Sequence, residues 1–156
     1  NRVPAEAVEQ LLDDAFGQDR HSRTAYLLRI PQTEIAALSF AILDGTRLTG
    51  SIQCWPIKLE NTRLVLVGPV AVAPDRQGTG LGKQLMQAML DAAAHRGNPP
   101  MAMIGDPEYY GRFGFSAEQT GGWTLPGPWE PRRLLLRNVA GHSLPEAGML
   151  ERDDAL

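Results

Sequence analysis

The sequence predicts an α/β (α+β) fold, in which one domain is built on a central mixed sheet that is mostly antiparallel, contains a splayed parallel pair of strands and is flanked by helices. An apolar run at residues 64–72 leads through a glycine-rich turn into an amphipathic helix, and a second short apolar run follows at residues 101–105. A strand, a helix and a strand in this order form a crossover unit, so the two strands should be parallel neighbours. Two earlier runs, at residues 35–43 and 48–59, are joined by an Asp-Gly pair, which is a strong signal for an antiparallel hairpin.

Length, charge and cysteine content limit the possible functions. A chain of 156 residues suits a single domain, which we place at residues 1–156, and a net charge of −3 gives no electrostatic basis for binding nucleic acid. Cys54 is the only cysteine, so neither an internal disulfide nor a cysteine-built metal site is possible, and we expect no metal and a reducing, cytoplasmic location. We expect no membrane partner and no signal peptide, because no apolar run approaches the ~18 residues of a membrane span.

The run at residues 64–72 should be the central strand. It is rich in β-branched residues and has no ionisable side chain, as a strand buried on both faces requires. Pro69 cannot donate a hydrogen bond to a neighbouring strand, so the strand should be bulged or splayed there. In the helix that follows, the apolar residues have helical spacing, and Gly97 should occupy the C′ position. The apolar residues are Leu81, Leu85, Met86, Met89, Leu90 and Ala93.

The turn between this strand and this helix reads QGTGLG, at residues 77–82. A glycine-rich turn that opens a helix exposes backbone N–H groups near the positive end of the helix dipole, which suits an anion and above all a phosphate. A P-loop is excluded, because Gln77 and Gln84 stand where it needs glycine and Ser or Thr. The dinucleotide pattern also fails, because Lys83 or Leu85 stands where its last glycine belongs. A strand-to-helix connection without a ligand remains the alternative.

The pattern that fits is Gln/Arg-x-x-Gly-x-Gly/Ala, in which Gln77, Gly80 and Gly82 take the defined positions after a Val-Ala-Pro sequence at residues 72–74. This pattern resembles the acetyl-CoA pyrophosphate loop of the GNAT superfamily of N-acetyltransferases.

A second signature of that family, Y-x-x-x-G-F, is present as Tyr110, Gly114 and Phe115. The longer sequence around it, GD-x-x-YY-x-RFGF, resembles that of the YhbS-like branch of bacterial predicted acetyltransferases. The resemblance extends over residues 36–115. The family normally has a strand before its first helix; here that strand would lie upstream of Asn1 or be absent.

The resemblance implies an acetyl-CoA-dependent N-acetyltransferase. Its acceptor would be a primary amine of a small molecule, protein or peptide, attacking the thioester directly in a ternary complex. Coenzyme A or acetyl-CoA is the implied co-substrate, bound with the help of the charge of Lys83 or Arg76. The implied binding residues are Val70, Ala71, Val72, Gln77, Gly78, Thr79, Gly80, Leu81, Gly82, Lys83, Asp106 and Tyr109.

Tyr110 holds the position of the family's general acid, which would protonate the departing thiolate; the alternative is a core aromatic residue. Many members place a basic glutamate on or near the central strand, and residues 64–72 contain none. Asp106, Glu108, His21 or an ordered water chain could serve instead. A non-catalytic acyl-CoA-binding or regulatory module therefore remains an alternative function.

Another open reading is a different acyl donor, with Trp55 or Met103 shaping the thioester end of the site. The acceptor should contact the variable segments at residues 17–29 and 121–131. In the first of these, the candidates for substrate contact are His21, Tyr26 and Arg29, and solvated surface residues are the alternative. A homodimer is left open.

The remaining segments complete the expected fold. A first helix should span residues 4–16, and Pro107 should open a short helix that ends near Gly111. Residues 121–131 should be a loop in which Trp123 and Trp129 either pack or line the acceptor site, residues 132–139 the last strand, and residues 140–156 a surface or frayed tail. Cys54 should be an inert core thiol, because no base adjoins it.

Overall fold

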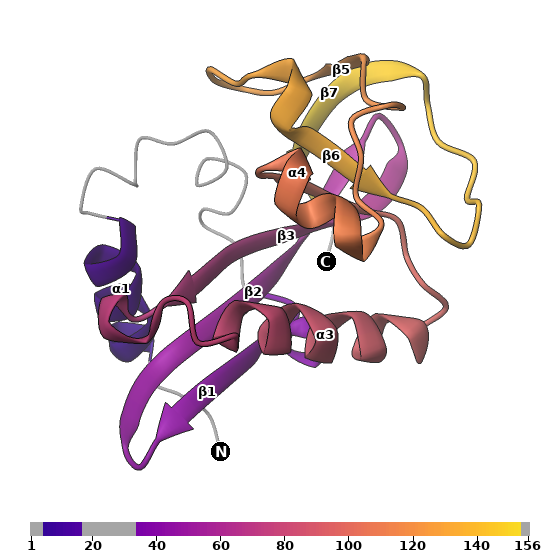
Figure 1. The fold of residues 1–156 in the computed structure, drawn as a ribbon. Coiled ribbons are helices and arrows are strands. Elements are labelled where there is room, and N and C mark those ends of the chain that lie inside the picture. Colours follow the sequence, from indigo (N-terminus) through magenta and orange to yellow (C-terminus); the bar gives the residue numbers. More distant parts are fainter. Residues whose placement is uncertain (1–4, 17–33, 154–156) are drawn as a thin grey trace.

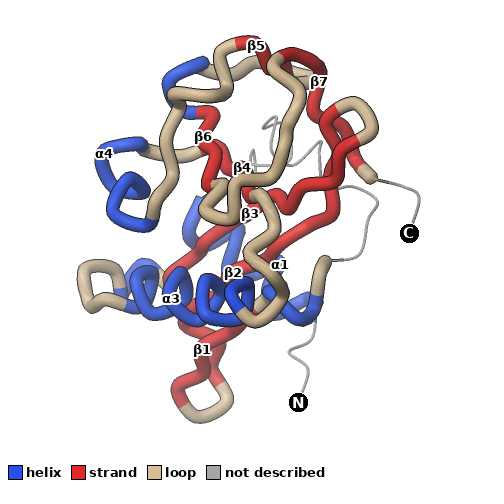
Figure 2. The backbone as a smooth tube through the Cα atoms, turned by 90° about the vertical axis from the view of Figure 1, so that its right-hand side faces the viewer, coloured by secondary structure: helices blue, strands red, loops and turns tan. Residues whose placement is uncertain are grey.

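The computed structural model describes residues 5–16 and 34–153 of the chain. Within these residues, the strands form a mixed sheet in the order β5-β7-β2-β3-β4-β6, and β1 also pairs with β2. The hairpin of β1 and β2 lies at one end of the molecule and β5 and β7 lie at the other (Figure 1, Figure 2). None of the described helices has the length and apolar character needed to cross a membrane.

The α-helices are α1 (Ala5–Phe16), α3 (Leu81–Ala94) and α4 (Pro107–Tyr110). The strands are β1 (Phe40–Asp44), β2 (Arg47–Leu59), β3 (Thr62–Val72), β4 (Met101–Ile104), β5 (Gly122–Thr124), β6 (Leu134–Arg137) and β7 (Ala147–Arg152). Short 3₁₀ helices occur at η2 (Ala36–Leu38), η3 (Pro74–Arg76), η4 (Gly111–Phe113) and η5 (Pro131–Arg133).

Strand β3 lies at the centre of the sheet and is buried on both faces, as its composition predicts. Val65 and Val67 pack into the core beneath α3, whereas Leu64 and Leu66 pack on the opposite face with residues of β5, β6 and β7. Farther along the same strand, Ala71 packs against α1. Helix α3 therefore covers one face of the sheet, and α1 covers part of the other.

The predicted irregularity of β3 at Pro69 is confirmed. β3 pairs with β2 in antiparallel fashion, and the register shifts between the pairs Ile52–Val70 and Cys54–Val67. Two steps along β2 thus correspond to three steps along β3, which is a β-bulge with its extra residue on β3.

The predicted parallel pair is also confirmed. β3 and β4 are parallel neighbours through the pairs Val65–Met101 and Leu66–Ala102, and their pairing extends no farther within the described residues. β4 continues in antiparallel pairing with β6 up to Ile104. The two parallel strands therefore separate beyond Leu66, and β3 runs on toward α3 paired, among the described strands, only with β2.

Helix α3 packs with the face that its spacing predicts. Leu85, Met89 and Ala93 are among its buried residues. Gly97 has a φ of +80°, and the N–H of Asn98 donates to the carbonyl of Ala93 over 2.9 Å. This bond is the one that a C′ glycine permits, so the predicted helix end is confirmed.

Three sequence predictions about the sheet were wrong. Residues 35–38 are not strand, because the N–H of Leu38 and the hydroxyl of Ser39 both bond to the carbonyl of Ile35 and close a 3₁₀ turn instead. Residues 121–131 are not entirely loop, because β5 pairs with β7 in parallel. The strand predicted at residues 132–139 is limited to β6 (Leu134–Arg137), and it is not the last one.

The predicted surface tail at residues 140–156 contains β7, which pairs with β2 through Leu59–Leu150 and neighbouring residues. Leu150 is fully buried, and Trp123 is buried beside it in the same core, with its indole N–H donating to the carbonyl of Pro145 over 3.0 Å. Trp123 therefore packs the two segments together, which is the first of the two roles that the sequence allowed.

We expect Leu150→Ala to lower the free energy of unfolding by about 2–5 kcal/mol, because it removes a buried side chain from the core. The matched control is Met149→Ala on the same strand, where the side chain is 44% exposed and the loss should be under about 1 kcal/mol. Urea denaturation of both variants measures the difference. Equal, small losses would show that β7 does not stabilise the fold.

Candidate functional site

The glycine-rich turn lies between η3 and the first residue of α3, Leu81. Gly78 and Gly80 have φ values of +81° and +88°, in the left-handed region that favours glycine. A Cβ atom added at either glycine would meet no atom within 4 Å, so both positions face open space. Gln77 to Gly80 are exposed. The turn thus leaves its backbone open to close approach by a ligand.

The turn leads directly into the first N–H groups of α3. The N–H of Gln84 donates to the carbonyl of Gly80 over 3.1 Å, which is the first bond of the helix ladder. The N–H groups before Gln84, those of Leu81, Gly82 and Lys83, lie in the first turn, where a helix offers its donors no partner of its own. These donors and the helix dipole favour an anion at this end of α3.

The bulge in β3 decides where the backbone of its last residues points. Before the bulge, the N–H of Val65 donates to the carbonyl of Pro100, on the β4 side. After it, the N–H of Ala73 donates to Thr49 of β2. Because the backbone direction alternates along a strand, Val70 and Val72 direct their N–H and C=O groups away from β2. On that side β4 is no longer paired, so within the described part of the chain these groups line a strand edge without a partner strand.

Gln77 and Ala71 lie next to the backbone groups of this edge. The side-chain amide of Gln77 donates to the carbonyl of Val72 over 3.5 Å. Ala71, in contrast, has its backbone on the β2 side and its side chain buried against α1. Of the three strand residues expected at the site, Val70 and Val72 therefore direct their backbone groups toward this edge, where the carbonyl of Val72 is bonded by Gln77, and Ala71 separates them.

Helix α4 carries Tyr109 to the start of α3. A Cβ atom built on Gly82 would lie 3.9 Å from the Tyr109 hydroxyl oxygen and 3.9 Å from Cγ2 of Val72. The fold therefore brings together three of the predicted binding residues, which come from α4, α3 and β3. The ring of Tyr109 is held by Arg112, whose guanidinium carbon lies 4.4 Å from its centroid.

Tyr110 lies beside Tyr109, and the two rings meet edge to face with centroids 4.9 Å apart. Its ring packs on Gly105, where a Cβ atom would come within 2.8 Å of two ring carbons. Burial, and then the nearby Tyr109 and Asp106, raise the pKa of Tyr110 above its ordinary value. The phenol therefore stays protonated at neutral pH, as a proton donor must.

The two carboxylates near these tyrosines have structural partners. Asp106 caps α4 by accepting the N–H of Glu108 over 3.0 Å, and Glu108 forms an ion pair with Arg132. Hydrogen bonding to Glu108, together with the charges of Arg132 and Arg133, holds the pKa of Asp106 below its usual range. The lowered pKa makes Asp106 a weaker base. His21, Tyr26 and Arg29 lie outside the described residues.

The other residues singled out in the sequence have mainly structural positions. Cys54 is fully buried, and burial raises the pKa of its thiol to about 12, so it is the inert core thiol that we predicted. Met103 is also buried in the core. The indole N–H of Trp55 donates to the carbonyl of Gly68 over 2.7 Å and so supports the bulge. Trp129 packs against the same core as Trp123.

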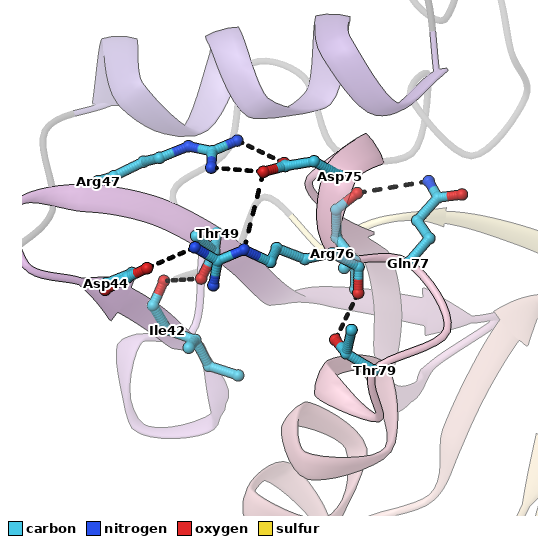
Figure 3. A network of polar contacts seen from close by, with 9 residues as sticks. Ile42, Asp44, Arg47, Thr49, Asp75, Arg76, Gln77 and Thr79 are labelled. Atoms are coloured by element: carbon cyan, nitrogen blue, oxygen red, sulfur yellow. Dashed lines mark hydrogen bonds and ion pairs between the residues drawn. The ribbon is translucent and has the colours of Figure 1, made fainter.

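One feature of the site escaped the sequence analysis. Arg76, expected there only as a possible phosphate contact, belongs to a group of ion pairs with Asp44, Arg47 and Asp75 (Figure 3). The partners lie 28 and 32 residues apart in the chain, so no local pattern indicates the pairing.

Comparison with known proteins extends these observations. Over 118 residues the chain is 29% identical to the "Uncharacterized N-acetyltransferase YhbS" of Escherichia coli K12. The aligned region covers 72% of this chain and 68% of that protein.

Solved structures share the fold. The crystal structure of the GNAT family N-acetyltransferase YhbS from Escherichia coli in complex with CoA matches with a TM-score of 0.76 and 23% identity, over 98% of this chain and 87% of that one. A GNAT family acetyltransferase from Brucella melitensis in complex with acetyl-CoA matches with a TM-score of 0.67 and 24% identity, over 99% and 94% of the two chains.

The model of the acetyltransferase (GNAT) family matches residues 5–115, which include the bulged strand, the glycine-rich turn and both tyrosines of α4. This match covers well over half of the sequence, and the chain therefore belongs to the acetyltransferase (GNAT) family.

Proposed function

We propose that the protein transfers the acetyl group of acetyl-CoA to a primary amine of a small molecule, protein or peptide. The observation that carries this proposal is the meeting of Gly82, Val72 and the Tyr109 hydroxyl at the open end of β3. This arrangement offers main-chain donors for a diphosphate and, next to them, an unpaired strand edge for a linear amide-containing arm. The relatives solved with CoA and acetyl-CoA support the choice of ligand.

In this proposal, the turn from Gln77 to Gly80 and the first N–H groups of α3 bind the diphosphate, and Lys83 adds a positive charge. The open surroundings of Gly78 and Gly80 support this assignment, because no atom of the described residues lies within 4 Å of a Cβ built at either position. The backbone groups of Val70 and Val72 would pair with the pantetheine amides and the thioester carbonyl. A donor aimed at the oxyanion contributes about 3 kcal/mol to such a reaction.

The reaction would proceed by direct attack in a ternary complex. The amine nitrogen forms a bond to the thioester carbon, the carbon–sulfur bond breaks, and the thiolate of CoA takes up a proton. A CoA thiol has a pKa near ~8.5, so a phenol with a pKa of ~10 or above can donate that proton. We assign this donation to Tyr110, whose pKa is raised by burial.

The amine must also lose a proton. Asp106 and Glu108 are held in a helix cap and an ion pair, which favours deprotonation through water or through a base outside the described residues. A cytoplasmic location goes with this proposal, because the one cysteine of the chain is a buried thiol, as suits a reducing compartment.

A second candidate function is a non-catalytic acyl-CoA-binding module. The observation that favours it is the central strand, where residues 64–72 include no carboxylate that could act as a base.

The experiment that separates the two functions measures thiol release from acetyl-CoA with a panel of amines and peptides, beside calorimetry of CoA binding. Buried Cys54 should give no background with a thiol reagent. We expect CoA binding and release of thiol that depends on one class of amine. Binding without release for any amine would indicate the module, and failure to bind CoA would refute both.

We expect Gly80→Asp to weaken CoA binding at least tenfold, because the side chain adds bulk and negative charge where the diphosphate approaches main-chain donors. The matched control is Gly97→Asp at the far end of α3, where the glycine also has a positive φ, +80°, and also faces open space. Both variants carry the same added charge at a glycine of positive φ, and because the helix dipole disfavours a negative charge at the end near Gly97, the control should lose at least as much stability. Calorimetry that gives both folded variants the affinity of the wild type would refute the assignment of the loop.

We expect Tyr110→Phe to lower kcat by roughly 10²–10⁴, the usual contribution of a positioned acid, while CoA affinity is retained because the ring remains. Since the pKa of Tyr110 is raised, the wild-type kcat should not lose this acid until above about pH 10.

Tyr109→Phe removes the hydroxyl near Gly82 and should change KM for acetyl-CoA rather than kcat. Steady-state kinetics of both variants test the division of roles. Small and similar effects on kcat would show that Tyr110 is structural and that another group protonates the thiolate.

A further inference from the structure

We infer that Asp44, Arg47, Asp75 and Arg76, here named the hairpin ion-pair network, hold the glycine-rich turn in its binding conformation, and that Arg76 acts there as a positioning residue without contacting the diphosphate. The inference rests on the proposed function and deepens it, because it concerns how the same loop is prepared for its ligand.

The network joins the β1–β2 hairpin to η3 by a defined geometry (Figure 3). Arg47 binds Asp75 through two parallel bonds, Nη1 to Oδ2 at 2.8 Å and Nη2 to Oδ1 at 2.6 Å. Arg76 bonds to Asp44 through Nη2, and its Nε lies 3.7 Å from Oδ2 of Asp75. Carboxylates and guanidiniums thus alternate in one row of contacts, from Arg47 through Asp75 and Arg76 to Asp44, and the four side chains together carry no net charge.

The network is coupled to the turn through the backbone. Asp75 and Arg76 are the last two residues of η3, directly before Gln77. The carbonyl of Arg76 accepts both the N–H of Thr79, at 3.3 Å, and the Thr79 hydroxyl. Because Thr79 lies between Gly78 and Gly80, a shift of Arg76 would move both glycines. The hairpin thereby fixes a segment whose glycines otherwise allow many conformations.

The same contacts make Arg76 a poor phosphate ligand. Its guanidinium already faces two carboxylates, and hydrogen bonding to Arg76 holds the pKa of Asp44 below its usual range. The pKa of Asp75 is lowered to about 2, chiefly by its bonds to Arg47, so both acids stay charged at neutral pH. Lys83, in contrast, is exposed and forms no ion pair with the described residues.

Exposed ion pairs contribute little to the stability of a fold, although a bidentate pair within a network is the more favourable case. Their effect should therefore appear less in the unfolding of the protein than in the order of the turn. A turn that is ordered before binding loses less entropy when the ligand arrives, which raises affinity. This reasoning predicts a change in the Kd for CoA with little change in Tm.

The test compares CoA binding by calorimetry in Asp44→Asn and Arg76→Gln. Positioning predicts that both substitutions weaken binding, by about three- to tenfold, because each breaks the same link. A direct Arg76–phosphate contact predicts that Asp44→Asn tightens binding by releasing Arg76, and that result would overturn the inference. The control Asp91→Asn removes the same charge from α3, where among the described residues Asp91 bonds only to Gln87 and His95 of the same helix and its C-terminal end, and should leave the Kd unchanged.

A charge exchange gives a second readout. Arg76→Asp alone should weaken CoA binding, and adding Asp44→Arg should restore much of the affinity by remaking the pair. If Arg76 contacts the diphosphate, the double variant stays as weak as the single one, and the inference is wrong.

A donor without the nucleotide completes the test. For S-acetylpantetheine, which has no diphosphate, the network variants should match the wild-type kcat/KM, whereas a general loss of structure would lower it. Failure of the wild type to bind CoA would refute the proposed function itself. Normal CoA binding in the wild type and in every network variant would refute only the positioning role.

Discussion

The extra residue of β3 at Gly68-Pro69 is the constraint on which the candidate site depends. Without it, the alternation of backbone direction would continue unchanged past Pro69, and the backbone groups of Val70 and Val72 would bond to β2. With it, the backbone direction is reversed, and Val70 and Val72 face the side that β4 leaves. The bulge is supported from β2 by Trp55, whose indole N–H bonds to Gly68. The bulge thus decides that Val70 and Val72, rather than Ala71 and Ala73, direct their backbone groups to the edge that β4 leaves.

The rest of the site is arranged around this edge by two helices of different kinds. α3 is anchored by a long buried face, so its first turn, which carries the free N–H donors, has a fixed place beside Val72. α4 is short and depends on local contacts: the Asp106 cap, the Glu108–Arg132 ion pair and the packing of Tyr110 on Gly105. Adjacent residues on this helix point in different directions, which allows Tyr109 to approach Gly82 while Tyr110 packs toward the core.

Sequence reasoning succeeded where a residue imposes its own local constraint. Pro69 cannot donate in a ladder, Gly97 takes a positive φ at a helix end, and an Asp-Gly pair turns a hairpin, and each is found as predicted. It failed where the structure of a segment depends on contacts with residues far away in the chain. β7 has a single buried residue, Leu150, and owes its strand structure to pairing with β2 and β5, which no period in its sequence reveals. The hairpin ion-pair network has the same origin, because its partners are separated by 28 and 32 residues.

A chain with a net charge of −3 has no general attraction for an anionic co-substrate, so the proposed site must depend on local groups. Charges farther away than the Debye length, about 8 Å at physiological ionic strength, are largely screened, whereas the first N–H groups of α3 would contact the ligand directly. Main-chain donors bind only if the backbone stands in the correct conformation, and the glycines that permit close approach also permit disorder. Contacts from outside the turn can hold its backbone in one conformation and still leave the glycines open to the ligand. The hairpin ion-pair network is suited to that role, since it has no net charge of its own and reaches the turn through a backbone carbonyl, that of Arg76.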